Sequence, residues 1–180
     1  MVDLSQYQRV VRFELYSIRS ILWFILSPIF FDWNYLPGTK LRVFILRNFG
    51  AKIGSGCIIK PGVKIKYPWK LVLGDHVWIG ERVWIDNLDK VIIGSHVCLS
   101  QGAYILTGSH DMNLVTFNLV TKSVVIEDGV WICANSIVLP GVCCGSHSVL
   151  SAGSVAKFNL NPFSVYVGNP ANFVKIRSIS

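Results

Sequence analysis

The sequence is short of acidic residues, and it offers no sign of a nucleic-acid partner. Ten Asp and Glu residues stand against 17 Lys and Arg residues, which gives a formal net charge of +7, and no acidic residue follows Asp128. The C-terminal third, which keeps Lys157, Lys175 and Arg177, is therefore basic and suits an anionic small ligand. Nucleic acid is not indicated as a partner, because the sequence contains no dense Lys/Arg run and no known nucleic-acid-binding motif.

The cysteines lack the spacing that disulfides and zinc sites use. There are five, an odd number, and no C-x-x-C pair is present. Neither a disulfide framework nor a structural zinc site is therefore expected. Cys57 and Cys144 fall at positions that are otherwise small or aliphatic, which predicts buried free thiols acting as small apolar side chains. This cysteine usage fits a cytoplasmic protein.

The longest uncharged apolar stretch, residues 20–31, is too short to cross a membrane. It contains Pro28 and ends before Asp32, whereas a spanning helix needs roughly 20 apolar residues. No small-residue cleavage site follows it, so a secretory signal peptide is not expected. We expect residues 1–52 to form a helical cap that packs on the rest of the chain. The alternative is an apolar patch that makes peripheral contact with the inner face of a membrane.

A six-residue repeat dominates the rest of the sequence. Aliphatic or small residues lead each repeat, and a small or β-branched residue follows four positions later in nearly every case. The leaders are Ile53, Ile59, Ile65, Leu73, Ile79, Ile85, Ile93, Leu99, Ile105, Ile126, Ile132, Val138, Cys144, Leu150 and Ala156. A period of six does not fit a helix. It is typical of a chain that turns a corner every six residues, so that three sides form one coil of a triangular solenoid.

This periodicity predicts an all-β prism of about five coils over residues 53–157, with residues 158–180 as a short C-terminal extension. The coils begin at 53, 73, 93, 126 and 144, so one of them carries a long insertion. We expect that insertion to protrude as a loop over residues 111–125. The side that starts at Ile85 (IDNLDK) does not suit a tight corner, and we expect it to bend outward as a ledge.

One of the four histidines departs from the repeat. His76, His96 and His147 occupy the same position of their hexapeptides, whereas His110 stands where the long insertion begins. A histidine outside the structural pattern is a candidate for chemistry, since imidazole can exchange a proton near neutral pH.

Five short motifs give the chain a family resemblance. They are FGAKIGSGCII (49–59), TGSHD (107–111), WICA (131–134), SAGSV (151–155) and GNPA (168–171). Across residues 40–177 the chain resembles the hexapeptide-repeat acyltransferases, in particular the colanic acid biosynthesis acetyltransferase branch and the sugar O-acetyltransferases. The resemblance implies a left-handed parallel β-helix, a homotrimer with sites between adjacent subunits, and acetyl-CoA as the acyl donor.

The resemblance also implies roles for particular residues. His110 matches the general base that takes a proton from a sugar hydroxyl as the hydroxyl attacks the thioester. Asp86 and Asn87 on the ledge, and Asp111 beside the base, are the candidates for holding the acceptor, a sugar or glycan intermediate of exopolysaccharide, capsule or lipopolysaccharide biosynthesis. An ordinary turn is the alternative interpretation of the ledge residues.

For acetyl-CoA, the same resemblance selects two small residues and three basic ones. Ala134 and Ala152 match backbone-contact positions, while Lys157, Lys175 and Arg177 match or lie near positions that meet the phosphates. Two departures weaken this match: the stretch before Lys157 reads SVAKF, and Asn172 replaces a frequent basic residue. A solvated face is the alternative for the three basic residues.

Three other functions compete with sugar O-acetylation. A zinc hydratase needs three converging histidines, and position 115, five residues beyond His110, is a valine, so we expect no metal. An N-acetyltransferase that acts on an amino or nucleotide sugar and a non-catalytic trimeric scaffold both remain open. Trp78, Trp84 and Trp131 share one position of their hexapeptides, which favours packing or subunit contact.

Overall fold

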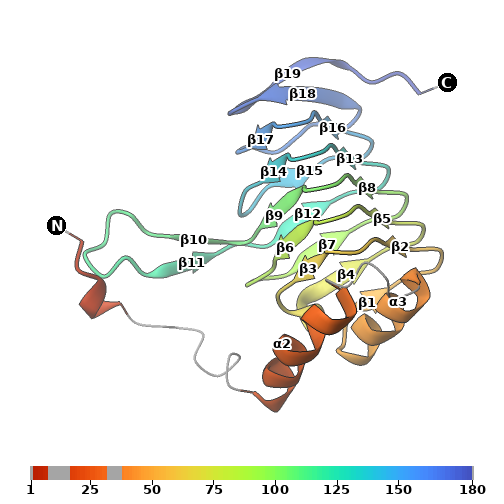
Figure 1. Ribbon diagram of the computed structural model, residues 1–180. Helices are drawn as coiled ribbons and strands as arrows, with labels where there is room; N and C mark the ends of the chain where they lie inside the picture. Colours follow the sequence, from red (N-terminus) through yellow and green to blue (C-terminus); the bar gives the residue numbers. More distant parts are fainter. Residues whose placement is uncertain (1, 8–16, 32–37, 180) are drawn as a thin grey trace.

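The protein is seen here as a computed structural model that describes residues 2–7, 17–31 and 38–179. Its main body is a column of stacked parallel coils with three flat sides (Figure 1). Sheet A contains β1 (Lys52–Ile53), β4 (Leu71–Leu73), β7 (Val91–Ile93), β12 (Val124–Ile126) and β15 (Cys143–Cys144). Sheet C contains β3 (Lys64–Ile65), β6 (Trp84–Asp86), β9 (Tyr104–Leu106), β14 (Ile137–Val138) and β17 (Val155–Ala156).

Sheet B forms the third side and extends beyond the last full coil. It contains β2 (Ile58–Ile59), β5 (Trp78–Ile79), β8 (Cys98–Leu99), β13 (Trp131–Ile132), β16 (Val149–Leu150), β18 (Ser164–Gly168) and β19 (Ala171–Ile176). The strand β18 pairs parallel with β16, and β19 then folds back antiparallel on β18. The C-terminal extension therefore covers the end of the column that lies uppermost in Figure 1.

The six-residue repeat is explained by burial. Leaders from successive coils are paired in register, as in Ile59 with Ile79 and Ile79 with Leu99, so they stack in columns inside the prism. All but Ile53 of the first coil are buried. Burial of one such side chain contributes about 1.5–3 kcal/mol, and a one-residue slip would turn it outward. The predicted triangular solenoid is confirmed.

Two helices close the other end of the prism. They are α2 (Ile18–Phe31) and α3 (Thr39–Asn48), and they lie beside the first coil in Figure 1. The Trp23 indole is buried and donates to the Ile65 carbonyl at 2.8 Å, while Leu46 is fully buried. An uncovered end would expose strand edges that invite pairing with other chains. The helices α2 and α3 supply a helical cap at this end, while residues 1, 8–16 and 32–37 of the predicted 1–52 cap lie outside the described residues. No helix among the described residues has the length and apolar character that crossing a membrane requires.

All irregular connections of the coils fall on one edge of the prism, between sheets C and A. We call residues 66–70, 86–90 and 107–123 on this edge the insertion corner. The first includes the short 3-10 helix η2 (Pro68–Lys70), and the third forms an antiparallel hairpin of β10 (Gly108–His110) and β11 (Leu119–Thr121). The hairpin projects away from the prism (Figure 1). The predicted loop of 111–125 is therefore misplaced at both ends, because the excursion already includes β10 and because Val124 is buried in β12.

Candidate active site

The ledge of the insertion corner is held by two buried polar side chains, and the first is Asn87. Its side chain is 0% exposed. The Asn87 Oδ1 atom accepts hydrogen bonds from the backbone N–H groups of Lys66 at 3.1 Å and Tyr67 at 3.0 Å. Its Nδ2 atom donates to the Tyr67 carbonyl at 2.6 Å. In this structure Asn87 thus fixes the connection of the coil below and does not face an acceptor, contrary to the role expected for it.

Thr107 is the second buried polar residue of the ledge. Its hydroxyl donates to the Asp86 carbonyl at 3.0 Å and accepts from the Asp89 backbone N–H at 2.9 Å. These bonds hold the backbone on both sides of Asn87. The side chain of Asp86 is left at the surface with 17% exposure, and its carboxylate lies 3.0 Å from the Lys66 ammonium. Asp86 is therefore a fixed, partly exposed carboxylate at the point where the hairpin begins.

His110 lies on the hairpin, opposite Leu119 in the two-stranded pairing, and its ring is exposed. The Nδ1 atom lies 2.8 Å from the backbone carbonyl of Phe117. A carbonyl oxygen can only accept a hydrogen bond, so Nδ1 must carry the proton of this contact. In the neutral ring, Nε2 then holds a lone pair, which is the state that a general base requires.

Two aromatic rings surround this imidazole. The Phe117 ring stacks on it with a centroid distance of 4.5 Å and an interplanar angle of 2°. The Tyr7 ring lies 5.7 Å away and is tilted. Tyr7 follows the short 3-10 helix η1 (Leu4–Gln6), which reaches the hairpin through a hydrogen bond from the Asp3 N–H to the Val115 carbonyl at 2.9 Å. No sequence pattern indicates these neighbours, because the Phe117 contact depends on the hairpin register and the Tyr7 contact joins segments far apart in the sequence.

Asp111 does not orient the imidazole. Its Oδ1 atom accepts from the Asn113 backbone N–H at 2.9 Å, and its own N–H bonds the Asn118 carbonyl at 2.9 Å. The orienting group for the His110 ring is the Phe117 carbonyl, seven residues along the chain. Asp111 shapes the hairpin tip beside His110, and its half-buried carboxylate stays within the same region.

The five residues expected to meet acetyl-CoA lie on different edges of the single chain. Ala134 and Ala152 occupy equivalent turns of neighbouring coils between sheets B and C, joined by the Gly153 N–H to the Ala134 carbonyl at 3.0 Å. Lys157 is exposed and follows β17 on the edge that carries the insertion corner. Lys175 is exposed on β19. The structure thus places Asp86 opposite Leu106 at the base of the hairpin that carries His110 and Asp111, and it does not bring the cofactor candidates to one place on one chain.

Arg177 is already engaged within the chain. Its guanidinium donates to the carbonyls of Gly129 and His147, each at 3.0 Å. Both acceptors lie in turns between sheets A and B, on the edge away from the insertion corner. The visible role of this arginine is to fasten the C-terminal extension to the prism.

The cysteines and the repeat histidines form no second reactive centre. All five cysteines are free, and Cys57, Cys133 and Cys144 are buried as small apolar side chains. Burial raises the pKa of the Cys144 thiol, so this thiol stays protonated and unreactive. In the part of the chain that the structure describes, no group of three or more His, Cys, Asp or Glu residues is arranged to hold a metal ion.

Comparison with known proteins connects this geometry to a family. No family model matches the chain. The chain is 38% identical over 161 residues to the WcaF protein of Escherichia coli strain K12, with 89% of this chain and 88% of that protein covered. That protein is provisionally named a colanic acid biosynthesis acetyltransferase. The chain is 29% identical to the galactoside O-acetyltransferase of Lactococcus lactis, covering 78% of this chain and 70% of that protein.

A solved structure gives the same relationship in three dimensions. The hexapeptide-repeat acetyltransferase of Vibrio cholerae, solved with acetyl coenzyme A, matches with a TM-score of 0.82 and 25% identity, covering 92% of this chain and 90% of that chain. The column described above is accordingly the left-handed parallel β-helix that the motifs predict. With its coils, its hairpin histidine and a relative matched along nearly the whole length, the chain belongs to the hexapeptide-repeat acetyltransferase family of WcaF.

Proposed function

We propose that this protein transfers the acetyl group of acetyl-CoA to a hydroxyl of a sugar or glycan intermediate, with His110 as the general base. The observation that carries the proposal is the 2.8 Å contact between His110 Nδ1 and the Phe117 carbonyl, which leaves Nε2 as the proton acceptor. The donor class and the acceptor class follow from the relatives, of which one is named a galactoside O-acetyltransferase and another was solved with acetyl coenzyme A.

The reaction needs no covalent enzyme intermediate. A sugar hydroxyl is a weak nucleophile, so Nε2 of His110 removes its proton as the oxygen attacks the thioester carbonyl carbon. The new C–O bond forms a tetrahedral intermediate, which collapses when the C–S bond breaks. The imidazolium then returns the proton to the leaving thiolate, and CoA and the acetylated sugar are released. The rate gain beyond proton transfer comes from alignment of the two substrates.

For the acceptor, we assign contact to Asp86 and Asp111 and positioning to Asn87. Asp86 is partly exposed where the hairpin begins, and a carboxylate accepts hydrogen bonds from sugar hydroxyls. Asn87 acts through the ledge backbone, because its amide is used by Lys66 and Tyr67. Acetylation of such an acceptor would support capsule, exopolysaccharide or lipopolysaccharide assembly. We place this reaction in the cytoplasm, a location with which the free cysteines are consistent.

For the donor, we propose a homotrimer with each site between adjacent subunits. Ala134 and Ala152 lie on one edge of the prism, Lys157 lies on another edge and Lys175 lies on β19. A cleft between two prisms is the arrangement in which one elongated ligand meets residues from more than one edge. The exposed rings of Trp78 and Trp131 on sheet B are suited to such subunit contact. No metal enters this mechanism.

The test is a thiol-release assay with acetyl-CoA against a panel of hydroxyl sugars, amino sugars and lipid-linked or nucleotide-linked glycans. We expect turnover with a hydroxyl acceptor and a loss of at least about 10²-fold in His110→Ala, the usual scale for a positioned base. Unchanged transfer in His110→Ala would leave the trimeric scaffold interpretation. Turnover restricted to amino sugars would change the product to an amide while keeping the base.

A further inference from the structure

The helix α2 exposes an aliphatic face to solvent. Its buried residues are Ser20, Trp23 and Phe31. The opposite face is aliphatic and exposed, and it consists of Ile18, Ile21, Leu22, Ile25 and Ile29. These positions recur at three- and four-residue spacing, so they form one continuous stripe. Solvent-facing helix surfaces in soluble proteins are normally polar, and a contiguous apolar stripe marks a contact surface.

The charge of the protein is concentrated at the same end of the prism. Residues 17–74, which include α2, α3 and the first coil, contain nine Lys and Arg residues and one acidic residue. Residues 75–180 contain six Lys and Arg residues and seven acidic residues. Six of the nine basic side chains are exposed, whereas Arg42 is buried and Lys66 and Lys70 are partly buried, so most of this positive charge lies on the surface at this end of the prism. An apolar stripe inside a basic surround is the combination that binds anionic bilayers.

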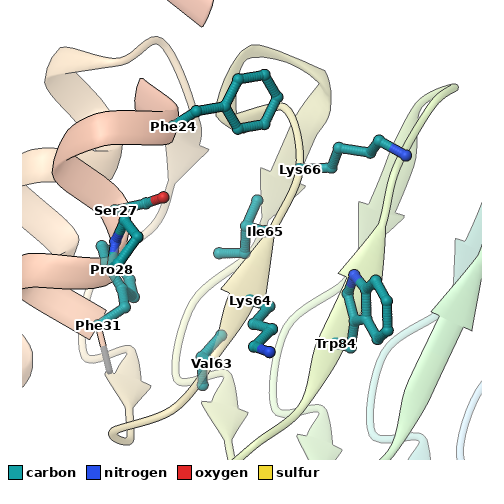
Figure 2. A pocket seen from close by; sticks show the side chains of 9 residues that line it. All are labelled: Phe24, Ser27, Pro28, Phe31, Val63, Lys64, Ile65, Lys66 and Trp84. Carbon is teal, nitrogen blue, oxygen red and sulfur yellow. The ribbon is translucent and has the colours of Figure 1, made fainter. Parts of the chain in front are cut away.

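A groove borders the stripe, between α2 and strand β3 (Figure 2). It has a volume of about 360 Å³, and its walls are mainly apolar, with Phe24 and Phe31 from the helix and Trp84 from β6. Lys64 of β3 and Lys66, which follows that strand, also line the groove (Figure 2). The Lys66 ammonium is paired with Asp86, whereas the Lys64 ammonium lies 5.8 Å from the Trp84 ring centroid. A phosphate group could bind the Lys64 ammonium here, while an attached apolar chain packs against the aromatic walls.

We propose that the stripe on α2 docks on a bilayer surface that contains anionic phospholipid. The helix lies in the interface with its five aliphatic side chains inserted, and the surrounding lysines and arginines meet lipid phosphates. Lys64 binds a headgroup at the mouth of the groove. This inference does not rest on the proposed acetyl transfer, because it concerns the end of the prism away from the hairpin tip and predicts binding with no substrate present.

A second copy of the chain fits this face less well than a lipid surface does. Two such ends placed against each other would bring together two regions that each hold nine basic residues, and like charges oppose close approach. An anionic bilayer attracts the same charges, because each Lys or Arg near its surface adds a favourable electrostatic contribution to the binding free energy. The stripe also matches hydrocarbon without requiring a complementary protein shape.

The full chain is tested by flotation with vesicles of phosphatidylcholine alone and with vesicles that also contain phosphatidylglycerol. We expect wild type to float with the anionic vesicles and to do so more weakly at high salt, since screening weakens the charge contribution. Ile25→Glu should weaken binding by at least about tenfold, because it removes an inserted aliphatic group and adds a repelled charge. Lys64→Glu should produce a smaller loss in the same direction.

The matched control is Ile176→Glu on β19, at the other end of the prism. Ile25 is 60% exposed and Ile176 is 63% exposed, so the two changes are equal in chemistry and similar in exposure. The control should float like wild type, and unchanged far-ultraviolet circular dichroism excludes unfolding of either variant. Absent binding by wild type, or equal loss in both variants, overturns the proposal. A change in oligomeric size of Ile25→Glu with no lipid binding by wild type overturns it in favour of contact between copies.

Discussion

The two groups of histidines in this prism lie on different edges and have different backbone settings and ring contacts. His76, His96 and His147 repeat in the turns between sheets A and B, each with a positive φ of 55° to 59°. The His76 and His96 rings stack at 5.2 Å on successive coils. His110 lies instead on a strand of the projecting hairpin, with Nδ1 bonded to a carbonyl from the other arm.

The comparison indicates that the surroundings of a histidine depend on whether it lies inside or outside the six-residue repeat. A repeat histidine fills a turn that recurs on every coil, and its backbone N–H bonds the coil below, as His96 does with the Asp75 carbonyl at 2.8 Å. The hairpin holds the His110 ring through the contact of Nδ1 with the Phe117 carbonyl, and Nε2 makes no part of that contact. The first arrangement stabilises the column, and the second leaves Nε2 available for the general-base role proposed above.

The same substitution on the two edges is the strongest way to break this comparison. His110→Asn should lower kcat by at least about 10²-fold, because amide nitrogen cannot accept the hydroxyl proton. His76→Asn should change kcat by less than about twofold, since Asn tolerates the positive φ of that turn. Both are measured by thiol release with acetyl-CoA. Comparable losses in the two variants would mean that the histidines act through the fold.

The burial of Asn87 provides a test of the ledge. Asn87→Ala removes three hydrogen bonds to Lys66 and Tyr67 and leaves buried backbone groups behind. We expect a loss of about 3 kcal/mol in the free energy of unfolding, from about 1–3 kcal/mol for a buried polar group left unsatisfied. Urea denaturation measures it.

The control for this change is Asn48→Ala. The amide of Asn48 makes one exposed bond to the Phe44 carbonyl at 2.8 Å, so its removal should cost less than about 0.5 kcal/mol. A stable Asn87→Ala protein with a raised KM for the acceptor would instead show that this amide touches the substrate.

The sequence predicted the column well because its signal is burial. Each leader faces the interior, so a six-residue period in aliphatic residues directly reports three sides and a shared core. His110 stands out in the sequence because it departs from that period, and its catalytic role stays a prediction. What holds its ring was not identifiable, because the Phe117 carbonyl meets it only through the register of β10 and β11.

The errors have a related cause. Asn87 reads as a polar surface residue, yet the two-residue insertion turns its amide inward against the previous coil. The loop boundary was misplaced because Val124 and Val125 look like loop valines until their pairing with β7 is known. Arg177 was a candidate near the phosphate positions, and this role stays a prediction; the sequence did not indicate that its guanidinium meets two carbonyls of distant turns. These are long-range contacts without periodicity.

Two aromatic residues allow a finer comparison of the same two edges. Phe117 stacks on His110 at 4.5 Å with φ of 48°, and Phe163 stacks on His147 at 4.8 Å with φ of 52°. Phe117→Ala should lower kcat roughly threefold to tenfold, because an aromatic stack contributes about 0.5–1.5 kcal/mol to ring placement. Phe163→Ala should leave kcat unchanged. Equal effects on kcat would remove the special status of the hairpin pair.

The smallest expected effect is a pH-dependent change in the free energy of unfolding. It concerns Glu127 and Ser146, which lie in turns between sheets A and B, the edge that carries the repeat histidines. Ser146 donates to the Glu127 carboxylate through its hydroxyl at 2.7 Å and its N–H at 2.8 Å, and these bonds lower the pKa of Glu127 below its ordinary value of 4.5. A lowered folded pKa means stability that is present above about pH 4.5 and lost as the pH falls through the folded value.

Ser146→Ala should therefore lose less than about 1 kcal/mol at neutral pH, since the carboxylate is solvent-screened, and should approach wild type at low pH. Urea denaturation at a series of pH values measures this loss. A difference that grows on acidification would reverse the sign and contradict the assignment. The pH dependence of kcat should be unaffected, because this carboxylate lies on the repeat edge.

The most direct measurement is the nitrogen NMR spectrum of His110, assigned by comparison with His110→Ala, at about pH 8, where an ordinary imidazole is neutral. The geometry predicts a protonated Nδ1 and an unprotonated Nε2, with the Nε2 signal responding when the acceptor binds. A proton on Nε2, with Nδ1 bare, would place no base at the surface and would contradict the account.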